Sequence, residues 1–300
     1  MISASAVKDL REKTGCGMMD CKKALTEANG DMERAIELLR EKGLAAAAKK
    51  AGRIAAEGIV TAVVDGATGV VLEINSETDF VGKNAEFQKF VSDVAELIIK
   101  KNPADVDALY AEALEGKTVR EVLNDKIATI GENMNIRRFE RYEGVLEAYI
   151  HGGGRIGVLV QFSLEDESKK DAPEFKTFAR DMAMQVAAAI PSYVRKEEVP
   201  AEVVEKEKEI LTAQAMNEGK PQAVAEKMVM GRIKKFYAEN CLLEQEYVLG
   251  DKVTVAQHVA SVAKELGGEI TITKFVRFEK GEGLEKREDN FAEEVASMMK

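Results

Sequence analysis

The 300-residue chain has few histidines and cysteines, two and three respectively, and no tryptophan. His151 and His258 lie far apart in the sequence, so neither has an evident partner for acid–base catalysis. Cys16, Cys21 and Cys241 show no paired spacing, which argues against a disulfide framework and against a zinc site. We therefore expect no catalytic residues, no metal and no cofactor, and a reducing, cytoplasmic location.

The chain also lacks a long apolar run and an excess of positive charge. No stretch approaches the roughly 18 uncharged apolar residues needed to span a bilayer. Residues 1–4 have neither the basic nor the apolar region of a secretory signal. The net charge of −10 argues against broad binding to a phosphate backbone, which requires a basic surface. The expected partner is accordingly another protein, with no direct contact to nucleic acid and none to a membrane.

Residues 1–54 are expected to form a three-helix module followed by a linker. Apolar residues recur at helical spacing in three short stretches that are separated by glycine-containing turns. After Gly43 the composition shifts to Ala and Lys, which gives a basic connector of helical propensity without a clear apolar face and favours a linker through Ala51. A compact module of this size resembles a ubiquitin-associated-type domain. The expected N-caps of its helices are Ser3 or Ser5, Asp20 and Asp31.

The body of the chain repeats one strand-and-helix pattern, which predicts an α+β core of two related subdomains. Residues 57–60 (EGIV) correspond to residues 143–146 (EGVL), and Glu86 and Phe87 of one amphipathic helix correspond to Glu174 and Phe175 of another. A residue that the shared scaffold requires should occur in both copies, so a residue present in one copy is a candidate for function. The expected boundaries are 55–142 for the first subdomain, and 143–199 together with 240–280 for the second.

The second copy is longer than the first because it contains an insertion, residues 200–239. The charged helical pattern of this insertion breaks once, at residues 219–221, which predicts two antiparallel helices joined in a hairpin. A C-terminal helical module is expected over residues 281–300, with Asp289 as its N-cap and with Phe291, Val295 and Met298 on one side.

The loop formed by Thr78, Asp79, Phe80 and Val81 is the main candidate for function. Its aromatic residue has no counterpart in the second copy, where residues 164–168 are acidic, so the scaffold does not demand it. An aromatic at a loop tip beside a carboxylate suits insertion into a partner's pocket. The alternative is structural: Ser76 or Thr78 caps the following helix, and Phe80 packs against that helix as a hydrophobic staple.

Two other positions have a similar double interpretation. Met18 and Met19 lie at a turn, where methionine either fills a core or serves an adaptable binding surface; we expect one of the two to be exposed. His151 lies at a turn where the first copy has Asp65, so its identity is also specific to one copy.

These segments together resemble the bacterial elongation factor Ts family over essentially the full length of the chain. The segments that carry the resemblance are residues 11–25, 78–81, 130–133, 151–152, 155–158 and 225–228. The resemblance implies an α+β protein with an N-terminal ubiquitin-associated-like module, a duplicated core, an inserted helical hairpin and a C-terminal helical module. These divisions agree with those expected from the residues.

The resemblance also implies a function and a set of contact residues. Members of the family are guanine-nucleotide exchange factors for elongation factor Tu, without chemistry of their own. They bind the GDP form, disturb its Mg²⁺ and phosphate site, and are displaced by GTP. The family implies that Phe80 enters an apolar pocket near the nucleotide, and it leaves a homodimer or a 2:2 complex open. The partner-binding candidates are Arg11, Met18, Met19, Lys22, Thr78, Asp79, Phe80, Val81, Ile130 and His151.

Other classes of function remain open at this point. The first is a non-catalytic scaffold that binds proteins through the three-helix module, which requires Met18 and Met19 but not Phe80. An enzyme is a weaker alternative, because Gly116, Lys117 and Thr118 imitate the end of a phosphate-binding loop without the preceding glycine that the motif needs. An RNA-binding role is opposed by the acidic balance.

Overall fold

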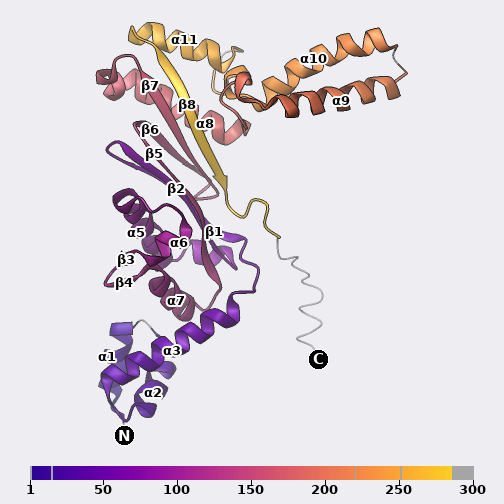
Figure 1. Ribbon diagram of the computed structural model, residues 1–300. Coiled ribbons are helices and arrows are strands. Elements are labelled where there is room, and N and C mark those ends of the chain that lie inside the picture. Colours follow the sequence, from indigo (N-terminus) through magenta and orange to yellow (C-terminus); the bar gives the residue numbers. More distant parts are fainter. Residues whose placement is uncertain (1, 15, 220, 251, 286–300) are drawn as a thin grey trace. The chain divides into compact units, whose positions relative to one another are not determined.

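The computed structural model describes residues 2–14, 16–219, 221–250 and 252–285 (Figure 1). It contains both helices and sheets and begins with helices, which confirms the mixed α+β class. Two compact units can be distinguished. The first comprises Met1–Thr61, Leu72–Phe139 and Glu279–Lys300, and the second comprises Ala62–Val71 and Glu140–Phe278. The proposed C-terminal helix with Asp289, Phe291, Val295 and Met298 lies outside the described residues.

The first unit begins with three helices, α1 (Ala4–Thr14), α2 (Met18–Glu27) and α3 (Met32–Lys50). The predicted caps of the first and third helices are present: Ser3 Oγ accepts from the N–H of Ala6 at 3.1 Å, and Asp31 accepts from that of Arg34 at 3.0 Å. The predicted cap of the second helix is wrong. That helix starts two residues before Asp20, and Gly17 precedes it without a side-chain cap.

The segment after Gly43, which was predicted to be a linker of helical propensity, is the last part of α3, which continues to Lys50. Its buried face in this part is made of Gly43 and Ala47. A Cβ at Gly43 would lie 3.4 Å from the Cβ of Ala128 on α7 (Val119–Ile130), so the small residues allow two helices to approach closely. The apolar face was therefore missed because it consists of residues that carry little hydrophobic surface.

The first sheet has the strand order β1-β2-β5, formed by β1 (Glu57–Asp65), β2 (Thr68–Ser76) and β5 (Met134–Glu143). The amphipathic helix α5 (Ala85–Lys101) buries the apolar side predicted from its periodicity, including Phe87, Phe90 and Ile98. The elements between β2 and β5 that remain are α4 (Asp79–Gly82), α6 (Val106–Ala111), β3 (Ala113–Leu114) and β4 (Lys117–Thr118).

The second sheet repeats this plan in the order β6-β7-β8. Its core centres on the ring contacts of Phe162 with Phe175 and Phe178. The helix α7 of the first copy and α11 of the second both begin with a capping box, built on Thr118 and Thr254. The elements of this copy are β6 (Val145–His151), β7 (Ile156–Leu164), β8 (Ile270–Glu279), α8 (Pro173–Ala189) and α11 (Val255–Leu266).

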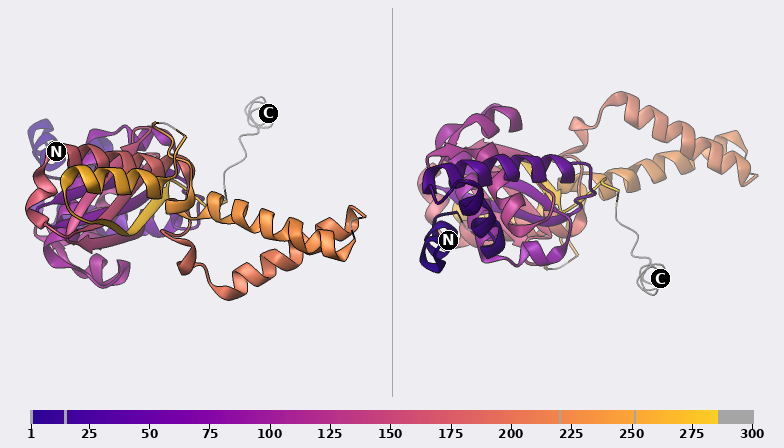
Figure 2. Two further views of the ribbon diagram at one scale, coloured as in Figure 1. Left: turned by 90° about the horizontal axis from the view of Figure 1, so that it is seen from above. Right: turned by 90° about the horizontal axis from the view of Figure 1, so that it is seen from below.

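The insertion consists of α9 (Ala201–Asn217) and α10 (Gln222–Asn240), which lie side by side (Figure 2). Leu211, Val229 and Ile233 form the apolar contact between them. Both helices keep charged residues on their other faces, so the pair is held mainly by a narrow apolar seam.

The long helices of the two copies end in the same left-handed conformation but with different residues. Asn102 follows α5 with φ 50° and ψ 54°, and Ile190 follows α8 with φ 48° and ψ 52°. A proline comes next in both copies. Asparagine tolerates this left-handed conformation, whereas a β-branched residue is strained in it. The side chain of Ile190 is 56% exposed, so little burial offsets the strain.

We expect the substitution Ile190→Asn to raise the free energy of unfolding by about 1 kcal/mol, because it relieves this strain. The reciprocal change Asn102→Ile should lower it by a similar amount. Urea unfolding of both variants measures the effect. A loss of stability in Ile190→Asn would show that contacts of the isoleucine side chain outweigh the backbone strain.

Candidate partner-binding surface

Phe80 lies in the single turn α4 with its side chain 75% exposed, whereas the next residue, Val81, is 3% exposed. The staple interpretation of Phe80 is therefore wrong, since Val81 takes the buried place. Thr78 stands at the N-cap position of α4, the helix that directly follows it, but its side chain makes no cap hydrogen bond there. Asn84 caps α5, where its side chain accepts from the N–H groups of Glu86 at 2.8 Å and Phe87 at 3.2 Å.

The loop before Phe80 is held by Glu132, a residue that the sequence analysis did not select. Glu132 accepts two hydrogen bonds from Thr78, one from the backbone N–H at 2.9 Å and one from Oγ1 at 2.7 Å. The neighbouring Asn133 donates its backbone N–H to Glu77 at 2.6 Å. The segment 130–133 had contributed to the family resemblance, and that was the available signal. Its role as the anchor of a loop more than fifty residues away depends on the fold.

Backbone packing fixes the other side of the loop. Gly58 has φ +113°, and a Cβ there would lie 2.2 Å from the carbonyl oxygen of Ile74, so only glycine fits. Gly82, at the end of α4, lies against the carbonyl of Gly58, with its ideal Cβ 3.1 Å from that oxygen. The turn that carries Phe80 is therefore supported by β1 on one side and by Glu132 on the other.

Asp79 and Phe80 are exposed together. Lys83 donates to Asp79 at 2.9 Å, and its Nζ lies 5.7 Å from the centre of the Phe80 ring. The hydrogen bond from Lys83 lowers the pKa of Asp79, and the positive charges of Lys83 and Lys280 act in the same direction. The loop consequently presents an apolar ring next to a carboxylate that is ionised at neutral pH.

The candidates on the N-terminal helices are all at the surface. Met18 is 55% exposed and Met19 is 62% exposed, so the expectation that only one of them is exposed is wrong. The core between these helices is completed by Cys21, Ala24, Leu25 and other residues, and neither methionine is needed there. Arg11 and Lys22 are exposed too.

The last two candidates have less prominent positions. Ile130, at the end of α7, is half-buried and directly precedes the segment that anchors the loop. His151 is the last residue of β6, where it pairs with Ile156. It is exposed, and its Nδ1 lies 3.0 Å from the hydroxyl of Tyr149. The structure thus brings the 78–81 loop together with the segment after Ile130, while His151 belongs to the second unit.

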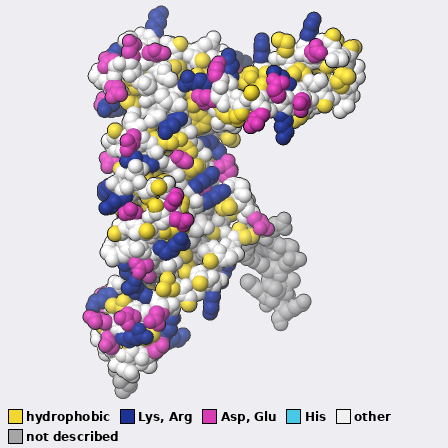
Figure 3. All heavy atoms as spheres, viewed as in Figure 1, with side chains coloured by type: hydrophobic (Ala, Val, Ile, Leu, Met, Phe, Trp, Pro, Cys, Tyr) yellow, Lys and Arg dark blue, Asp and Glu magenta, His cyan; other side chains and the backbone are white. Residues whose placement is uncertain are grey.

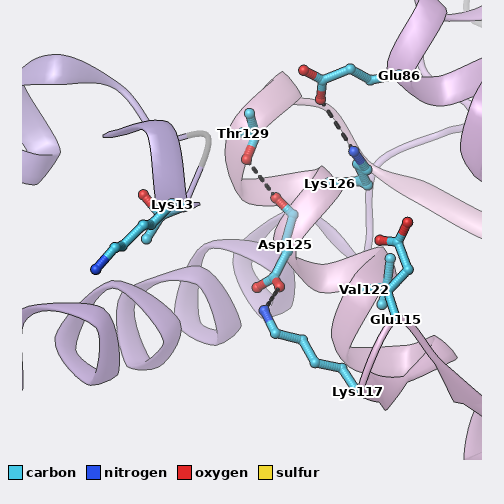
Figure 4. Close-up of a pocket in the computed structure, with 9 residues that line it drawn as sticks. Lys13, Glu86, Glu115, Lys117, Val122, Asp125, Lys126 and Thr129 are labelled. Atoms are coloured by element: carbon cyan, nitrogen blue, oxygen red, sulfur yellow. Dashed lines mark hydrogen bonds and ion pairs between the residues drawn. The ribbon is translucent and has the colours of Figure 1, made fainter. Parts of the chain in front are cut away.

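A cavity of about 350 Å³ lies in the first unit between α7 and the end of α1 (Figure 4). Two pairs of its charged residues bond each other: Lys117 donates to Asp125 at 2.5 Å, and Lys126 donates to Glu86 at 3.2 Å. Cys16 lies beside an adjoining cavity, and burial raises the pKa of its thiol, which makes it a poor nucleophile.

The remaining chemical alternatives also find structural roles. Thr118 of the apparent phosphate motif forms the capping box of α7. The ring of His258 stacks on Tyr247 with 4.1 Å between centroids. Among the described residues, no group of three His, Cys, Asp or Glu side chains could hold a metal ion. No described helix is long and apolar enough to cross a membrane. Figure 3 shows side chains of both charge signs interspersed over the visible face.

Comparison with known proteins identifies the family. The family described as Elongation factor TS matches residues 77–282. This chain belongs to the elongation factor Ts family. Its relatives include elongation factor Ts of Clostridium perfringens strain ATCC 13124, 58% identical over 99% of each chain. Elongation factor Ts of Syntrophotalea carbinolica is 52% identical over 100% of this chain and 99% of its own. The resemblance inferred from the motifs is confirmed.

Membership in the elongation factor Ts family also helps to decide between the exchange-factor function and a binding scaffold. The matched segment contains the whole 78–81 loop and the anchoring Glu132. The relatives agree with this chain over nearly its full length, N-terminal helices and hairpin included. A scaffold that uses the three-helix module alone is therefore not favoured.

Proposed function

We propose that this chain is the guanine-nucleotide exchange factor of elongation factor Tu in translation elongation, and that Phe80 is the residue that opens the nucleotide site. Family membership supports the general role. The single observation that supports the specific one is the exposure of Phe80 on a loop whose neighbours are held by Glu132 and Gly58. A rigidly presented aromatic loses little freedom on binding, which suits an interface anchor.

The physical basis of exchange is a competition for the partner's phosphate site. Much of the affinity of a GTP-binding protein for its nucleotide comes from the groups that hold Mg²⁺ and the phosphates. Phe80 inserts near these groups and displaces them, with Asp79 beside it, so binding of the factor weakens binding of GDP. Coupling of this kind is reciprocal, and incoming GTP therefore weakens binding of the factor and releases it.

Release of labelled GDP from elongation factor Tu, measured with and without this protein, tests the proposal. We expect a small amount of the chain to accelerate release of an excess of GDP complex, because the factor leaves unchanged after each exchange. Release that stays at the spontaneous rate at every concentration would contradict the proposal. Acceleration only at stoichiometric amounts would contradict the displacement by GTP.

The N-terminal helices are proposed to supply affinity rather than exchange, because Met18, Met19, Arg11 and Lys22 are exposed there and lie outside the duplicated pattern. The double substitution of Met18 and Met19 by Ala should raise the half-saturating concentration roughly tenfold, as expected when about 1.4 kcal/mol of apolar contact is lost. The exchange rate at saturation should stay close to that of the wild type. Titration of GDP release against factor concentration separates the two quantities.

The hairpin provides a matched control for this pair. Met216 is 49% exposed and Met230 is 70% exposed, and neither belongs to the proposed surface. Their double substitution by Ala removes the same chemical groups and should leave the titration unchanged. A fall in the saturating rate of the N-terminal variant would show that these methionines take part in opening the nucleotide site.

Three expectations stay predictions. His151 is proposed to contact elongation factor Tu. The division into a 1–54 module, the subdomains 55–142 and 143–199 with 240–280, the 200–239 hairpin and the 281–300 module is likewise proposed. A homodimer or a 2:2 complex remains an expectation about assembly.

A further inference from the structure

A short segment near the C-terminus, here called the strap (residues 279–284), crosses the first unit. Two consecutive arginines of β5, Arg137 and Arg138, hold its backbone. Arg137 donates to the carbonyl of Glu282 at 2.5 Å, and Arg138 donates to that of Glu279 at 3.3 Å. The side chain of Lys280 forms an ion pair with Glu57 at the start of β1. The strap is thus tied to the edge from which β1 begins.

The strap is clipped to a buried carboxylate. The side chain of Glu73, on β2, is fully buried, and it accepts the backbone N–H of Gly281 at 2.8 Å. It also accepts from Asn75 at 3.0 Å, from Arg137 at 3.1 Å and from Arg138 at 2.6 Å. Gly281 has φ +68°, and a Cβ there would lie 2.1 Å from the carbonyl oxygen of Ala56. The contact between Gly281 and Glu73, here called the clip, therefore requires glycine at position 281.

The second copy shows that the fold itself does not need this carboxylate. Strands β2 and β7 each have nine residues, and Glu73 and Gln161 are both the sixth. Gln161 bonds Thr273 at 2.7 Å, so a neutral amide serves at that position. By the same comparison that singled out Phe80, the charge of Glu73 is specific to the copy that carries the exposed loop.

The clip is continuous with the Phe80 loop. Asn75, which donates to Glu73, also donates to the carbonyl of Glu57 at 3.1 Å. One residue further along, Ser76 donates its hydroxyl to the carbonyl of Thr78 at 2.9 Å. The positive charge of Lys280 on the strap also contributes to the lowered pKa of Asp79. The polar contacts of the strap with the start of β1 and with β2 thus end at Asn75, and the next residue in the chain, Ser76, begins the contacts of the loop.

We infer that the strap is a clamp that helps to position the exchange loop: with Gly281 seated on Glu73, the segment 76–83 is held in its binding conformation, and without the strap it is held less firmly. Glu73 and Gly281 act through the loop and are positioning residues. The inference rests on the proposed role of Phe80. Its consequence is that release of the strap slows nucleotide exchange although every residue of the loop is retained.

The test compares two glycines of the same strap in the full-length protein. Gly281→Ala places a Cβ against Ala56, whereas Gly283, with φ +72°, has no heavy atom within 4 Å of its ideal Cβ. Both substitutions strain a left-handed residue, but only the first displaces the strap. Glu73→Gln, the residue of the second copy, weakens the clip from its other side. Amide hydrogen exchange of residues 76–83 and 279–284 and GDP release are measured for all three variants.

We expect Gly281→Ala and Glu73→Gln to increase amide exchange in both segments and to slow GDP release roughly five- to tenfold, since loop side chains must then be ordered on binding. Gly283→Ala should resemble the wild type in the 76–83 segment and in GDP release. A strap that loses protection while residues 76–83 keep theirs overturns the inference. A strap that keeps its protection in both variants contradicts the clip itself.

Phe80→Ala, measured in parallel, separates the inference from the function on which it rests. If Phe80→Ala releases GDP as fast as the wild type, the proposed role of the loop fails. If Phe80→Ala is slow and Gly281→Ala matches Gly283→Ala, the role of the loop stands and the clamp is rejected.

Discussion

Phe80→Ala should slow factor-dependent GDP release roughly 30-fold while leaving the protein folded. Truncating an interface anchor costs about 2 kcal/mol or more, and each 1.4 kcal/mol corresponds to a tenfold change in rate. The stability of the folded state should hardly change, because the ring is 75% exposed and the buried position of the turn is occupied by Val81. GDP release and thermal unfolding, measured on the same preparation, give the two halves of the result.

Val224→Ala is the control for removal of an exposed apolar side chain as such. Val224 is 44% exposed and lies on the hairpin helix α10, outside the proposed surface. It should leave GDP release unchanged. A Phe80→Ala protein that unfolds at a clearly lower temperature would show that the ring stabilises the turn after all. A stable variant with a normal rate of release would instead remove Phe80 from the mechanism.

Periodicity and duplication were sufficient to predict the main elements and the exposed candidate. The buried side of α5 follows directly from the spacing of Phe87, Phe90 and Ile98. The absence of an aromatic in the second copy identified Phe80 as a residue that the scaffold does not require, and its exposure agrees with this. Both inferences depend on local patterns, which a sequence displays directly.

The features that were predicted wrongly or missed are those that tertiary packing determines. The buried face of α3 at Gly43 and Ala47 was not predicted because these two residues carry almost no hydrophobic signal. Asp20 resembles a cap by composition, yet the helix starts at Met18, since the capping position depends on where the backbone turns rather than on which polar residue is near. Such contacts between distant segments leave little trace in a single sequence.

The anchors of the loop illustrate the same limit. Glu132 is one of many carboxylates in an acidic chain, and nothing in its neighbourhood indicates that it accepts two hydrogen bonds from Thr78. Glu73 stands in an apolar strand, where a single charge is conspicuous. Its role as the acceptor for Arg137, Arg138 and Gly281 becomes apparent only from the structure.

The burial of Glu73 leads to a prediction about stability and pH. Burial by itself raises the pKa of a carboxyl, but the hydrogen bonds from Gly281, Asn75 and Arg138, with the charge of Arg138, outweigh it, so the pKa of Glu73 is lowered. A group whose pKa is lower in the folded state stabilises that state when ionised. This contribution is complete above the unfolded pKa of about 4.3 and is lost as the pH falls through the folded value.

Glu73→Gln should therefore lower the free energy of unfolding at pH 7 by about 2–3 kcal/mol, because two arginines lose their common partner. This expected loss lies at or below the lower end of the range that is usual for breaking a buried ion pair. The reason is that Arg137 and Arg138 remain 22% and 30% exposed and can turn to water. The difference from the wild type should be constant between pH 7 and about 5.5 and should shrink below about 4. Urea unfolding across this pH range measures it, with Glu37→Gln, an exposed partner of Arg34 on α3, as the control for loss of a surface charge. A difference that grows as the pH falls would mean that folding raises the pKa of Glu73, so that its hydrogen bonds and the charge of Arg138 do not outweigh its burial.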